Sequence, residues 1–183
     1  MKKIKYIIID LECTCWDRHD PLKEQHETIE IGAVFLNKDF KKIGQLQLYT
    51  MPKNNKTLSQ YCIDLTGITP QVLTTKSISF PEAINKLKTF INLEEEPVFG
   101  SWGKFDQTQL MRDCYEWDIP YPFSKDNHIN IKTEFMQKYN KKKCGLQKAC
   151  RILKLRFNGA PHCGLDDANM IAEVFREIQK DNK

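Results

Sequence analysis

The sequence predicts an α/β fold in which helices pack against a mixed sheet. Three observations lead to this prediction: an apolar strand near the N-terminus, two further strands soon after it, and a later strand between amphipathic helices. Neighbouring strands with short connections usually pair antiparallel, whereas a strand reached through a helical crossover can lie parallel to the first. The chain of 183 residues has the length of one domain with a sizeable core, so we expect a single domain over residues 1–183.

The strands are predicted from apolar runs and from alternation. Ile7, Ile8 and Ile9 are typical of a strand buried on both faces. Ile31, Ala33 and Phe35 alternate with other residues, as in a strand with one face on the core. The four segments predicted as strands are residues 5–11, 26–37, 43–50 and 96–102.

The helices are predicted from apolar residues that recur at helical spacing. In residues 80–91 these residues are Ala83, Ile84, Leu87, Phe90 and Ile91, and Pro81 is favourable near the first turn. The segments predicted as helices are residues 58–68, 80–91, 105–117, 143–154 and 166–180. Because the last strand lies between helices, we expect it to join the sheet parallel to the first.

Composition limits the class of protein. With 40% hydrophobic and 28% charged residues, the chain is typical of a soluble globular protein. No apolar run approaches the ~20 residues that span a bilayer, and the N-terminus lacks a signal peptide, so we expect a cytoplasmic protein without membrane contact. Seven cysteines without regular spacing indicate reduced thiols rather than disulfides or a zinc site. The net charge of +4 permits a polyanionic partner.

Two acids at the end of the first strand raise the question of function. Asp10 and Glu12 are two residues apart and therefore project from the same face of a strand. Like charges this close repel each other, and a hard divalent cation relieves the repulsion by accepting oxygen ligands from both. The alternative is a strand end that frays into a solvated acidic turn.

Further acids follow later elements. Asp106 lies just past the fourth strand, near a helix N-terminus, where it is either a helix cap or a functional acid. His162 lies on a loop with glycine and proline neighbours, and Asp166 and Asp167 open the last helix. We expect Asp166 to cap that helix and Asp167 to lie in its first turn, where the helix dipole favours negative charge.

Together these residues predict phosphodiester hydrolysis. Four carboxylates on separate segments supply ligands for two divalent metals, and the loop histidine supplies a general base. The four acids are Asp10, Glu12, Asp106 and Asp167, and the histidine is His162. In a two-metal site the ions lie ~3.5–4 Å apart and flank the reacting phosphate.

The motifs "IIIDLECT", "HETIEIGAVFL", "LTGIT", "SWGKFD" and "PHCGLDDA" occur in this order. The chain thereby resembles the DEDDh 3′–5′ exonucleases, and within them the subfamily of the animal histone-mRNA 3′-end exonuclease and its bacterial relatives. This resemblance implies a ribonuclease H-like fold with a mixed five-stranded sheet flanked by helices. The family spacing H-x4-D matches His162 with Asp167 rather than Asp166.

The resemblance also implies a role for each site residue. Asp10 would bridge two Mg²⁺ ions, for which Mn²⁺ can substitute, while Glu12 and Asp167 hold the first ion. Asp106 would support the second ion, and His162 would deprotonate the attacking water. The family reaction releases 5′-mononucleotides from a 3′ end.

Substrate contacts are expected beside these acids. Thr14 matches the family residue whose backbone contacts the terminal 3′-OH. Tyr61 and either Trp102 or Phe105 would stack on the terminal base, since stacking of this kind tolerates any base. Core packing is the alternative role for Tyr61 and Trp102. A run of cations also follows, which is either a solvated surface or a site for a phosphate backbone: Lys138, Lys141, Lys142, Lys143, Lys148, Arg151, Lys154 and Arg156.

Three functions are compatible with these motifs. The first is an exonuclease that takes RNA, as a single strand or a 3′ overhang. The second keeps this chemistry on DNA or on both polymers, and the third is a regulatory module on a nuclease fold without catalysis. The five intact site residues favour an enzyme. The animal enzyme has a nucleic-acid-binding module before its nuclease domain, and because this chain starts at the first strand, we expect no targeting of that kind.

Overall fold

The computed structural model describes residues 3–20, 25–91 and 96–180. Its centre is a mixed sheet with the strand order β4-β3-β2-β1-β5-β6. The strands are β1 (Tyr6–Cys13), β2 (Thr28–Leu36), β3 (Lys42–Met51), β4 (Ser77–Ser79), β5 (Val98–Ser101) and β6 (His128–Asn130). The α/β class and the mixed sheet predicted from the sequence are therefore confirmed.

The pairing of the strands also follows the prediction. β1 pairs antiparallel with β2, and β2 pairs antiparallel with β3, while β5 lies parallel to β1. The sheet has six strands among the described residues, not the expected five. The strands β4 and β6, which the sequence analysis did not predict, have three residues each and lie at the two edges, too short to produce an alternating pattern.

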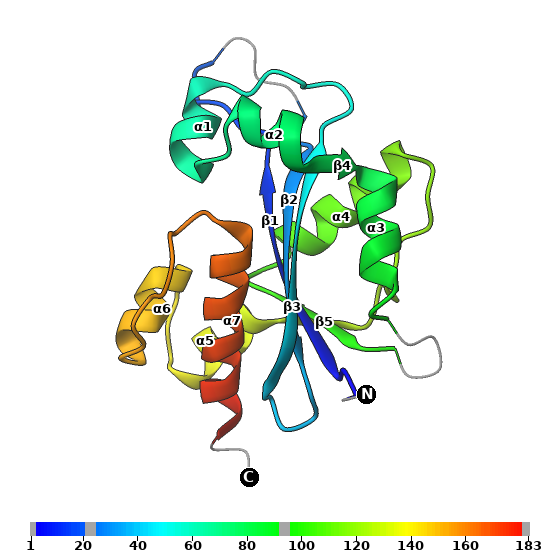
Figure 1. The fold of residues 1–183 in the computed structure, drawn as a ribbon. Helices are drawn as coiled ribbons and strands as arrows, with labels where there is room; N and C mark the ends of the chain where they lie inside the picture. The colour runs from blue at the N-terminus through cyan, green and yellow to red at the C-terminus, as the bar shows by residue number, and fades with distance from the viewer. Residues whose placement is uncertain (1–2, 21–24, 92–95, 181–183) are drawn as a thin grey trace.

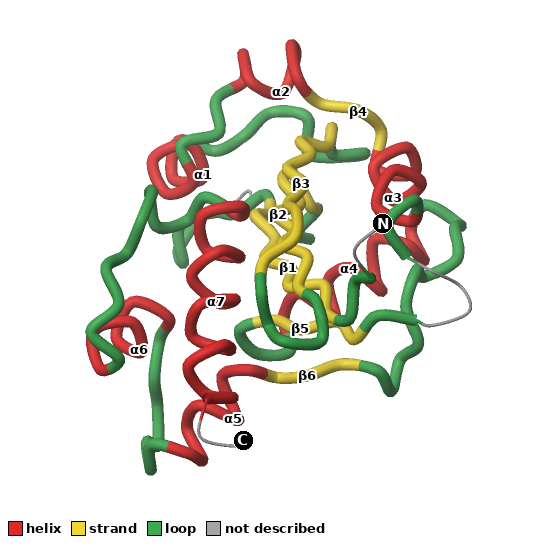
Figure 2. Tube along the Cα trace, turned by 60° about the horizontal axis from the view of Figure 1, so that its bottom comes forward, coloured by secondary structure: helices red, strands yellow, loops and turns green. Residues whose placement is uncertain are grey.

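Helices cover both faces of this sheet. They are α1 (Gln60–Thr66), α2 (Pro70–Lys76), α3 (Phe80–Lys88), α4 (Phe105–Glu116), α5 (Ile131–Lys138), α6 (Leu146–Ile152) and α7 (Gly164–Gln179). Figures 1 and 2 show α7 on one face of the sheet and α3 and α4 on the other, with α1 and α2 beyond one end of it. None of the helices in the described ranges is long and apolar enough to cross a membrane.

The helices α2 and α5 were not predicted, and the residues next to their first turns explain why. The helix predicted over residues 58–68 is α1, which ends at Thr66. Gly67 caps it with a left-handed φ of 71°. A new helix, α2, then begins at Pro70, with the Thr69 side chain accepting the Val72 N–H. The other unpredicted helix, α5, has a weakly amphipathic sequence and begins after Asn130, which caps it.

The residues of β1 divide between two cores. Ile7 and Ile9 pack with residues of α3 and α4, whereas Ile8 packs with residues of α5, α6 and α7. Side chains alternate along a strand, so Asp10 and Glu12 project on the same side as Ile8. This is the face that α7 covers, and it places both acids toward the start of that helix.

Two glycines allow α7 to approach the sheet at this point. Gly32 on β2 pairs with Asp10 across the ladder. A Cβ atom at Gly32 would lie 2.1 Å from the backbone carbon of Gly164, the first residue of α7. Only glycine fits here, and the backbone of the helix start therefore lies directly against the strand beside Asp10.

Candidate active site

The end of β1 holds two of the predicted acids. Glu12 is buried and Asp10 partly buried, and Glu12 pairs with Glu30 of β2 across the ladder. The pairing of β1 with β5 stops at Ile8. Beyond this point the backbone N–H of Leu11 donates to Asp106 Oδ1 at 3.1 Å.

Asp106 therefore lies beside β1 at the start of α4. Lys104 is the N-cap of this helix, and no side chain caps it. The alternative role of Asp106 as a helix cap is therefore wrong, because its carboxylate accepts a hydrogen bond from the strand instead. The residue is 5% exposed, so α4 brings a buried carboxylate to the edge of β1 where β5 ends.

The start of α7 places the fourth acid. We predicted that Asp166 caps this helix, and this is wrong: the N-cap is Cys163, without a side-chain cap, and Asp166 lies in the first turn. The Asp166 carboxylate instead accepts the Ala160 N–H of the preceding loop at 2.9 Å. Asp167 also lies in the first turn, where the helix dipole favours its charge.

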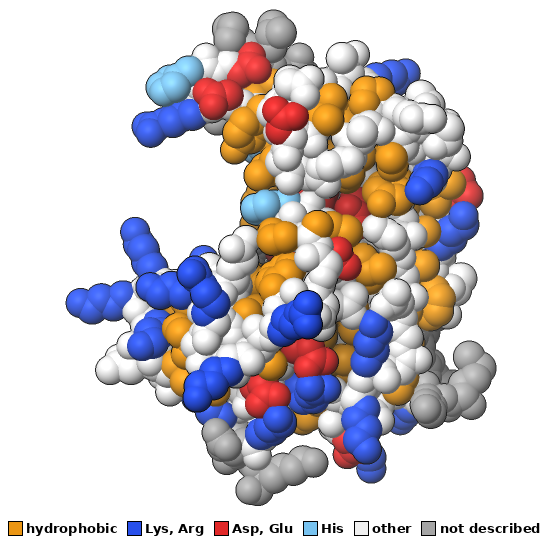
Figure 3. Space-filling view, turned by 60° about the vertical axis from the view of Figure 1, so that its left-hand side comes forward, with side chains coloured by type: hydrophobic (Ala, Val, Ile, Leu, Met, Phe, Trp, Pro, Cys, Tyr) orange, Lys and Arg blue, Asp and Glu red, His pale blue; other side chains and the backbone are white. Residues whose placement is uncertain are grey.

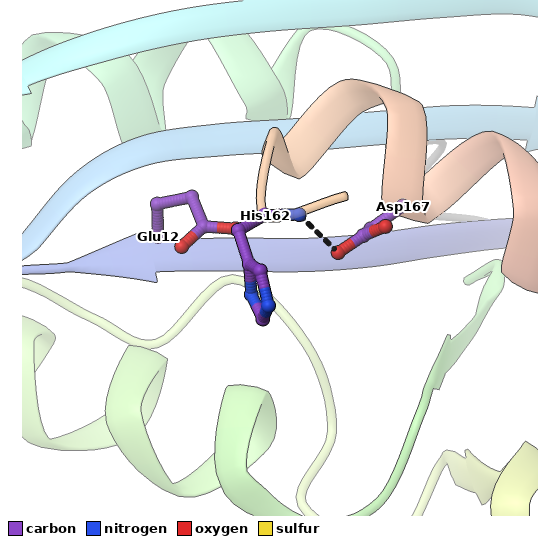
Figure 4. A group of neighbouring side chains, drawn as sticks. All are labelled: Glu12, His162 and Asp167. Atoms are coloured by element: carbon purple, nitrogen blue, oxygen red, sulfur yellow. Dashed lines mark hydrogen bonds between the residues drawn. The ribbon is translucent and has the colours of Figure 1, made fainter. Parts of the chain in front are cut away.

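His162 lies between two of these acids. Its backbone N–H donates to Asp167 Oδ2 at 3.1 Å, and its φ of 63° is left-handed, which is uncommon for a residue other than glycine. One ligand atom each of Glu12, His162 and Asp167 lies within 4.8 Å of the others. Figure 4 shows Glu12 on the strand, Asp167 on the helix and the His162 side chain between them.

The electrostatics of the four acids are those of a site that lacks positive charge. Burial and the neighbouring carboxylates, Asp106 first, hold the pKa of Asp10 well above its ordinary value. Burial and the charge of Glu30 raise the pKa of Glu12 to about 8. Burial also raises the pKa of Asp106, to about 6, and that of Asp167.

These carboxylates have the chemistry of a divalent-cation site. Among the described residues, no lysine or arginine forms an ion pair with any of the four. Among the described residues, the backbone N–H groups of Leu11 and His162 donate to Asp106 and Asp167, and the Ser101 side chain also favours the charged form of Asp106. Hard divalent cations bind such oxygens and remove the repulsion that raises these pKa values. The residues therefore fit Mg²⁺ or Mn²⁺.

A further acid, buried beside these four, was missed in the sequence. Glu30 is 1% exposed and accepts the Leu165 N–H at 3.2 Å and the Gln47 side-chain amide at 2.8 Å. It thereby ties the first turn of α7 to β2 and β3. The available signal in the sequence was an acid placed between two isoleucines, Ile29 and Ile31. Both isoleucines are completely buried in the structure.

Thr14 lies on the loop that leaves β1, and its own groups already have partners. Its N–H donates to the Glu27 carbonyl at 2.8 Å, and its hydroxyl accepts the Glu27 N–H at 2.9 Å. Its carbonyl contacts a ring nitrogen of His26. Thr14 is 1% exposed, so it holds the loop near the site rigidly in place.

The predicted aromatic residues differ in exposure. Tyr61 on α1 is 44% exposed, and Phe105 at the start of α4 is 53% exposed. Trp102 is partly buried and packs against the core, with its ring centroid 5.9 Å from that of Phe135. His26, which was not predicted, lies between Trp16 and Phe105, with centroid distances of 6.0 and 6.3 Å.

Comparison with protein families gives one match that covers most of the chain. The family RNase_T, described as "Exonuclease", matches residues 7–175. Among individual proteins, 3′–5′ exoribonuclease 1 of Homo sapiens is 31% identical over 95% of this chain and 52% of its own length. The 3′–5′ exonuclease Snipper of Drosophila melanogaster is 26% identical over 99% of this chain and 72% of its own.

Solved structures give the same result. The nuclease domain of 3′hExo, a DEDDh family member bound to rAMP, superposes with a TM-score of 0.86 and 31% identity, over 96% of this chain and 92% of that one. A 3′-exonuclease that recognises the 3′ end of a histone mRNA stem-loop superposes with a TM-score of 0.87 and 29% identity, over 96% and 63%. The chain spans about half the length of the 3′–5′ exoribonuclease 1 proteins it matches.

Proposed function

Because the chain belongs to the RNase_T exonuclease family, we propose that it is a metal-dependent 3′–5′ exonuclease that acts on RNA. The observation that carries the proposal is the cluster of carboxylates around the end of β1, which has no cationic partner among the described residues and lies beside an accessible histidine. The two relatives compared above are named as a 3′–5′ exoribonuclease and a 3′–5′ exonuclease, which supports the direction of cleavage and, for the first, the polymer.

Each acid has a role in holding two Mg²⁺ ions, for which Mn²⁺ can substitute. Burial raises the pKa of Asp10, and the charges of Asp106, Asp167 and Glu12 raise it further, so Asp10 interacts with each of the other three acids. As the family resemblance implies, Asp10 would help to hold both ions, Glu12 and Asp167 would help to hold the first, and Asp106 the second. When bound, the ions lower the pKa of the attacking water and neutralise charge on the scissile phosphate.

His162 is the proposed general base. Its side chain is exposed, lies beside Glu12 and Asp167, and comes from a loop whose conformation Asp167 fixes through a hydrogen bond to the His162 backbone. The imidazole would accept a proton from the attacking water and release it to solvent. Asp167 thus serves the site twice, because it holds both a cation and the loop that carries the base.

The terminal nucleotide would bind beside the exposed aromatic side chains, with its 3′-OH at the backbone carbonyl of Thr14, which can accept a second hydrogen bond. Tyr61 and Phe105 have free ring surface for stacking, whereas Trp102 packs against the core. We therefore propose Phe105 rather than Trp102 as the second stacking residue. The substrate would be a single strand or a 3′ overhang, which exposes its terminal base.

Several expectations from the sequence stay predictions. They are the single domain over residues 1–183, the cytoplasmic location, the choice of RNA over DNA, and the roles of the site and substrate-binding residues. A regulatory module without catalysis is the remaining alternative, and the complete set of four acids and His162 argues against it.

The test is a degradation assay with matched RNA and DNA oligomers labelled at the 5′ end. With Mg²⁺ or Mn²⁺ the RNA should shorten in one-nucleotide steps, and a chelator should stop the reaction. Internal cuts, chelator-resistant cleavage, or shortening from the 5′ end would contradict the proposal. Faster degradation of DNA than of RNA would keep the mechanism and reverse the substrate.

A further inference from the structure

Positive charge is concentrated in one segment, and the proposed reaction does not use its lysines and arginines. Residues 135–165 contain eight lysines and arginines and no aspartate or glutamate. Since the whole chain has a net charge of +4, the rest of the chain has a net charge of −4. The segment runs from the second half of α5 through α6 to the loop that carries His162.

Two of these cations lie beside the proposed site. A hollow of about 320 Å³ is lined by Lys148 and Arg151 of α6 together with His162 and Asp167. Residues three apart on a helix share one face, with Cβ atoms ~5–6 Å apart, so both cations project from the same side of α6. In Figure 3 the molecule is hollowed on one face, and Lys and Arg side chains gather along one side of the hollow.

The chain after α6 continues this arrangement. Lys154 adopts a left-handed φ of 56°, and the Leu155 N–H then donates to the Cys150 carbonyl at 2.9 Å, which turns the chain back along the helix end. From here exposure alternates: Leu155 and Phe157 pack against the core, whereas Lys154 and Arg156 are exposed. The backbone therefore directs both cations to solvent.

In the part of the chain that the structure describes, no acid forms an ion pair with the cations of α6 and the turn after it. Elsewhere Lys86, Arg176 and Lys180 each form an ion pair with a glutamate three or four residues away. Within the described ranges, no such pair involves Lys148, Arg151, Lys154 or Arg156. Unpaired exposed cations repel one another, and bound phosphates neutralise this repulsion. Binding also releases the counterions that were condensed on the nucleic acid, which favours the complex.

We propose that these four residues, here called the α6 cation surface (Lys148, Arg151, Lys154 and Arg156), bind the phosphates of the nucleic-acid strand upstream of the scissile bond. The inference rests on the proposed function, since it assumes a strand whose 3′ end lies beside His162. The surface would raise affinity for long strands without contacting the reacting phosphate, so it sets how many upstream nucleotides the enzyme holds.

The test compares a charge reversal on this surface with a matched one elsewhere. The variant is K148E/R151E, and the control is K38E/K41E in the turn between β2 and β3, whose lysines are also exposed. This turn follows the end of β2 that pairs with the start of β1, at the far end of the strand from Asp10. Binding of a fluorescent 12-nucleotide RNA is measured in chelator, so that the result does not depend on catalysis.

We expect K148E/R151E to weaken binding at least tenfold at moderate salt, and K38E/K41E to change it less than twofold. The slope of log affinity against log salt should fall in magnitude by about 1.4, since each contact to a single strand contributes ~0.7. The neutral variant K148Q/R151Q should show the same slope change with a smaller loss, which separates the lost contacts from any folding defect. Equal effects of both reversals, or an unchanged slope, would overturn the proposal.

Hydrolysis separates this proposal from the function on which it rests. The p-nitrophenyl ester of a nucleoside 5′-monophosphate has no upstream phosphate, so K148E/R151E should lose at least tenfold more activity on the 12-nucleotide strand than on this ester. If wild type hydrolyses neither substrate yet binds RNA through the α6 cation surface, the exonuclease proposal fails and the binding proposal stands. If the variant loses both activities equally, the surface acts on the site itself and the binding proposal fails.

Discussion

The helix α4 carries two buried aspartates whose hydrogen-bond partners and neighbouring charges differ. Asp113 is 4% exposed, and its carboxylate accepts the Thr28 hydroxyl at 2.6 Å, the Thr28 N–H at 3.1 Å and the Gln109 amide at 2.9 Å. Asp106, seven residues earlier, is 5% exposed and accepts the Leu11 N–H among three other carboxylates. The protein satisfies Asp113 with its own donors and leaves Asp106 in a cluster of like charges.

This difference distinguishes a structural acid from a functional one. Burying a carboxylate is costly unless donors or cations compensate it. At Asp113 the fold itself supplies hydrogen-bond donors, which oppose the rise in pKa that burial causes, so loss of these hydrogen bonds should cost stability. At Asp10, Glu12, Asp106 and Asp167 the compensation has to come from bound cations, so removal of a charge should cost activity and spare the fold.

The largest effect is expected at the centre of the acidic cluster. Asp10→Asn removes the carboxylate that is most strongly influenced by the others, and activity should fall below detection. In chelator at pH 8 the variant should melt a few degrees above wild type, because one source of repulsion is gone. Exonuclease assays and thermal melts measure the two effects. A variant that is inactive and also less stable would place Asp10 with Asp113 as a structural residue.

The histidine beside the cluster should affect rate alone. His162→Ala should lower the rate by ~10²–10⁴-fold, the usual contribution of a general base. Its side chain is exposed, so the melting temperature should stay within a degree or two of the wild-type value. Single-turnover degradation of a labelled strand gives the rate. A loss of less than tenfold would show that another group takes the proton.

The acidic cluster should also make stability depend on pH and metal. The pKa of Glu12 is raised to about 8, whereas an unfolded glutamate ionises near its ordinary value of ~4.3. Between these values the folded chain holds a proton that the unfolded chain has lost, so in chelator the free energy of unfolding should decrease as pH rises from about 4.5 to 8. One pKa unit corresponds to ~1.4 kcal/mol, so we expect a loss of a few kcal/mol.

Divalent cations should reverse this loss, because they bind the ionised carboxylates. Denaturant unfolding at pH 5 and pH 8, with and without Mg²⁺, measures the effect. Mg²⁺ should stabilise the chain strongly at pH 8 and weakly at pH 5. Equal stabilisation at both values would mean that the bound metal does not depend on these groups.

The smallest expected effect is the loss of stability in Asp113→Asn, and it compares the two aspartates of α4 directly. Asp113→Asn offers an amide where Gln109 and Thr28 require an acceptor, and it should destabilise the fold by ~1–3 kcal/mol. Activity per folded molecule should stay within twofold. The matched control is Asp106→Asn, two helical turns earlier, which should abolish activity and leave stability in chelator unchanged or higher. The comparison fails if both variants behave alike.

The sequence indicated several residues that the structure brings together, although their catalytic and metal-binding roles stay predictions. Glu12, His162 and Asp167 have ligand atoms within 4.8 Å of one another, and Asp106 accepts the Leu11 N–H of β1. This placement was predictable because β1 alternates regularly and two of the acids lie in the first turns of helices. Glu30 was missed because a single glutamate in an apolar strand resembles an ordinary polar position until its partner on α7 is known. The capping role of Asp166 was wrong because its acceptor geometry depends on the loop at Ala160, which no local pattern encodes.

The contact between Gly32 and Gly164 limits which substitutions this site can accept during evolution. Most distances in a protein core depend on side chains, and compensating substitutions can shift them gradually. Here backbone meets backbone, so van der Waals contact between main-chain atoms limits how closely the strand with Asp10 and the helix with Asp167 approach. Even a single methyl group at Gly32 would push the start of α7 away from β2. Substitutions elsewhere in the core do not add atoms at this contact.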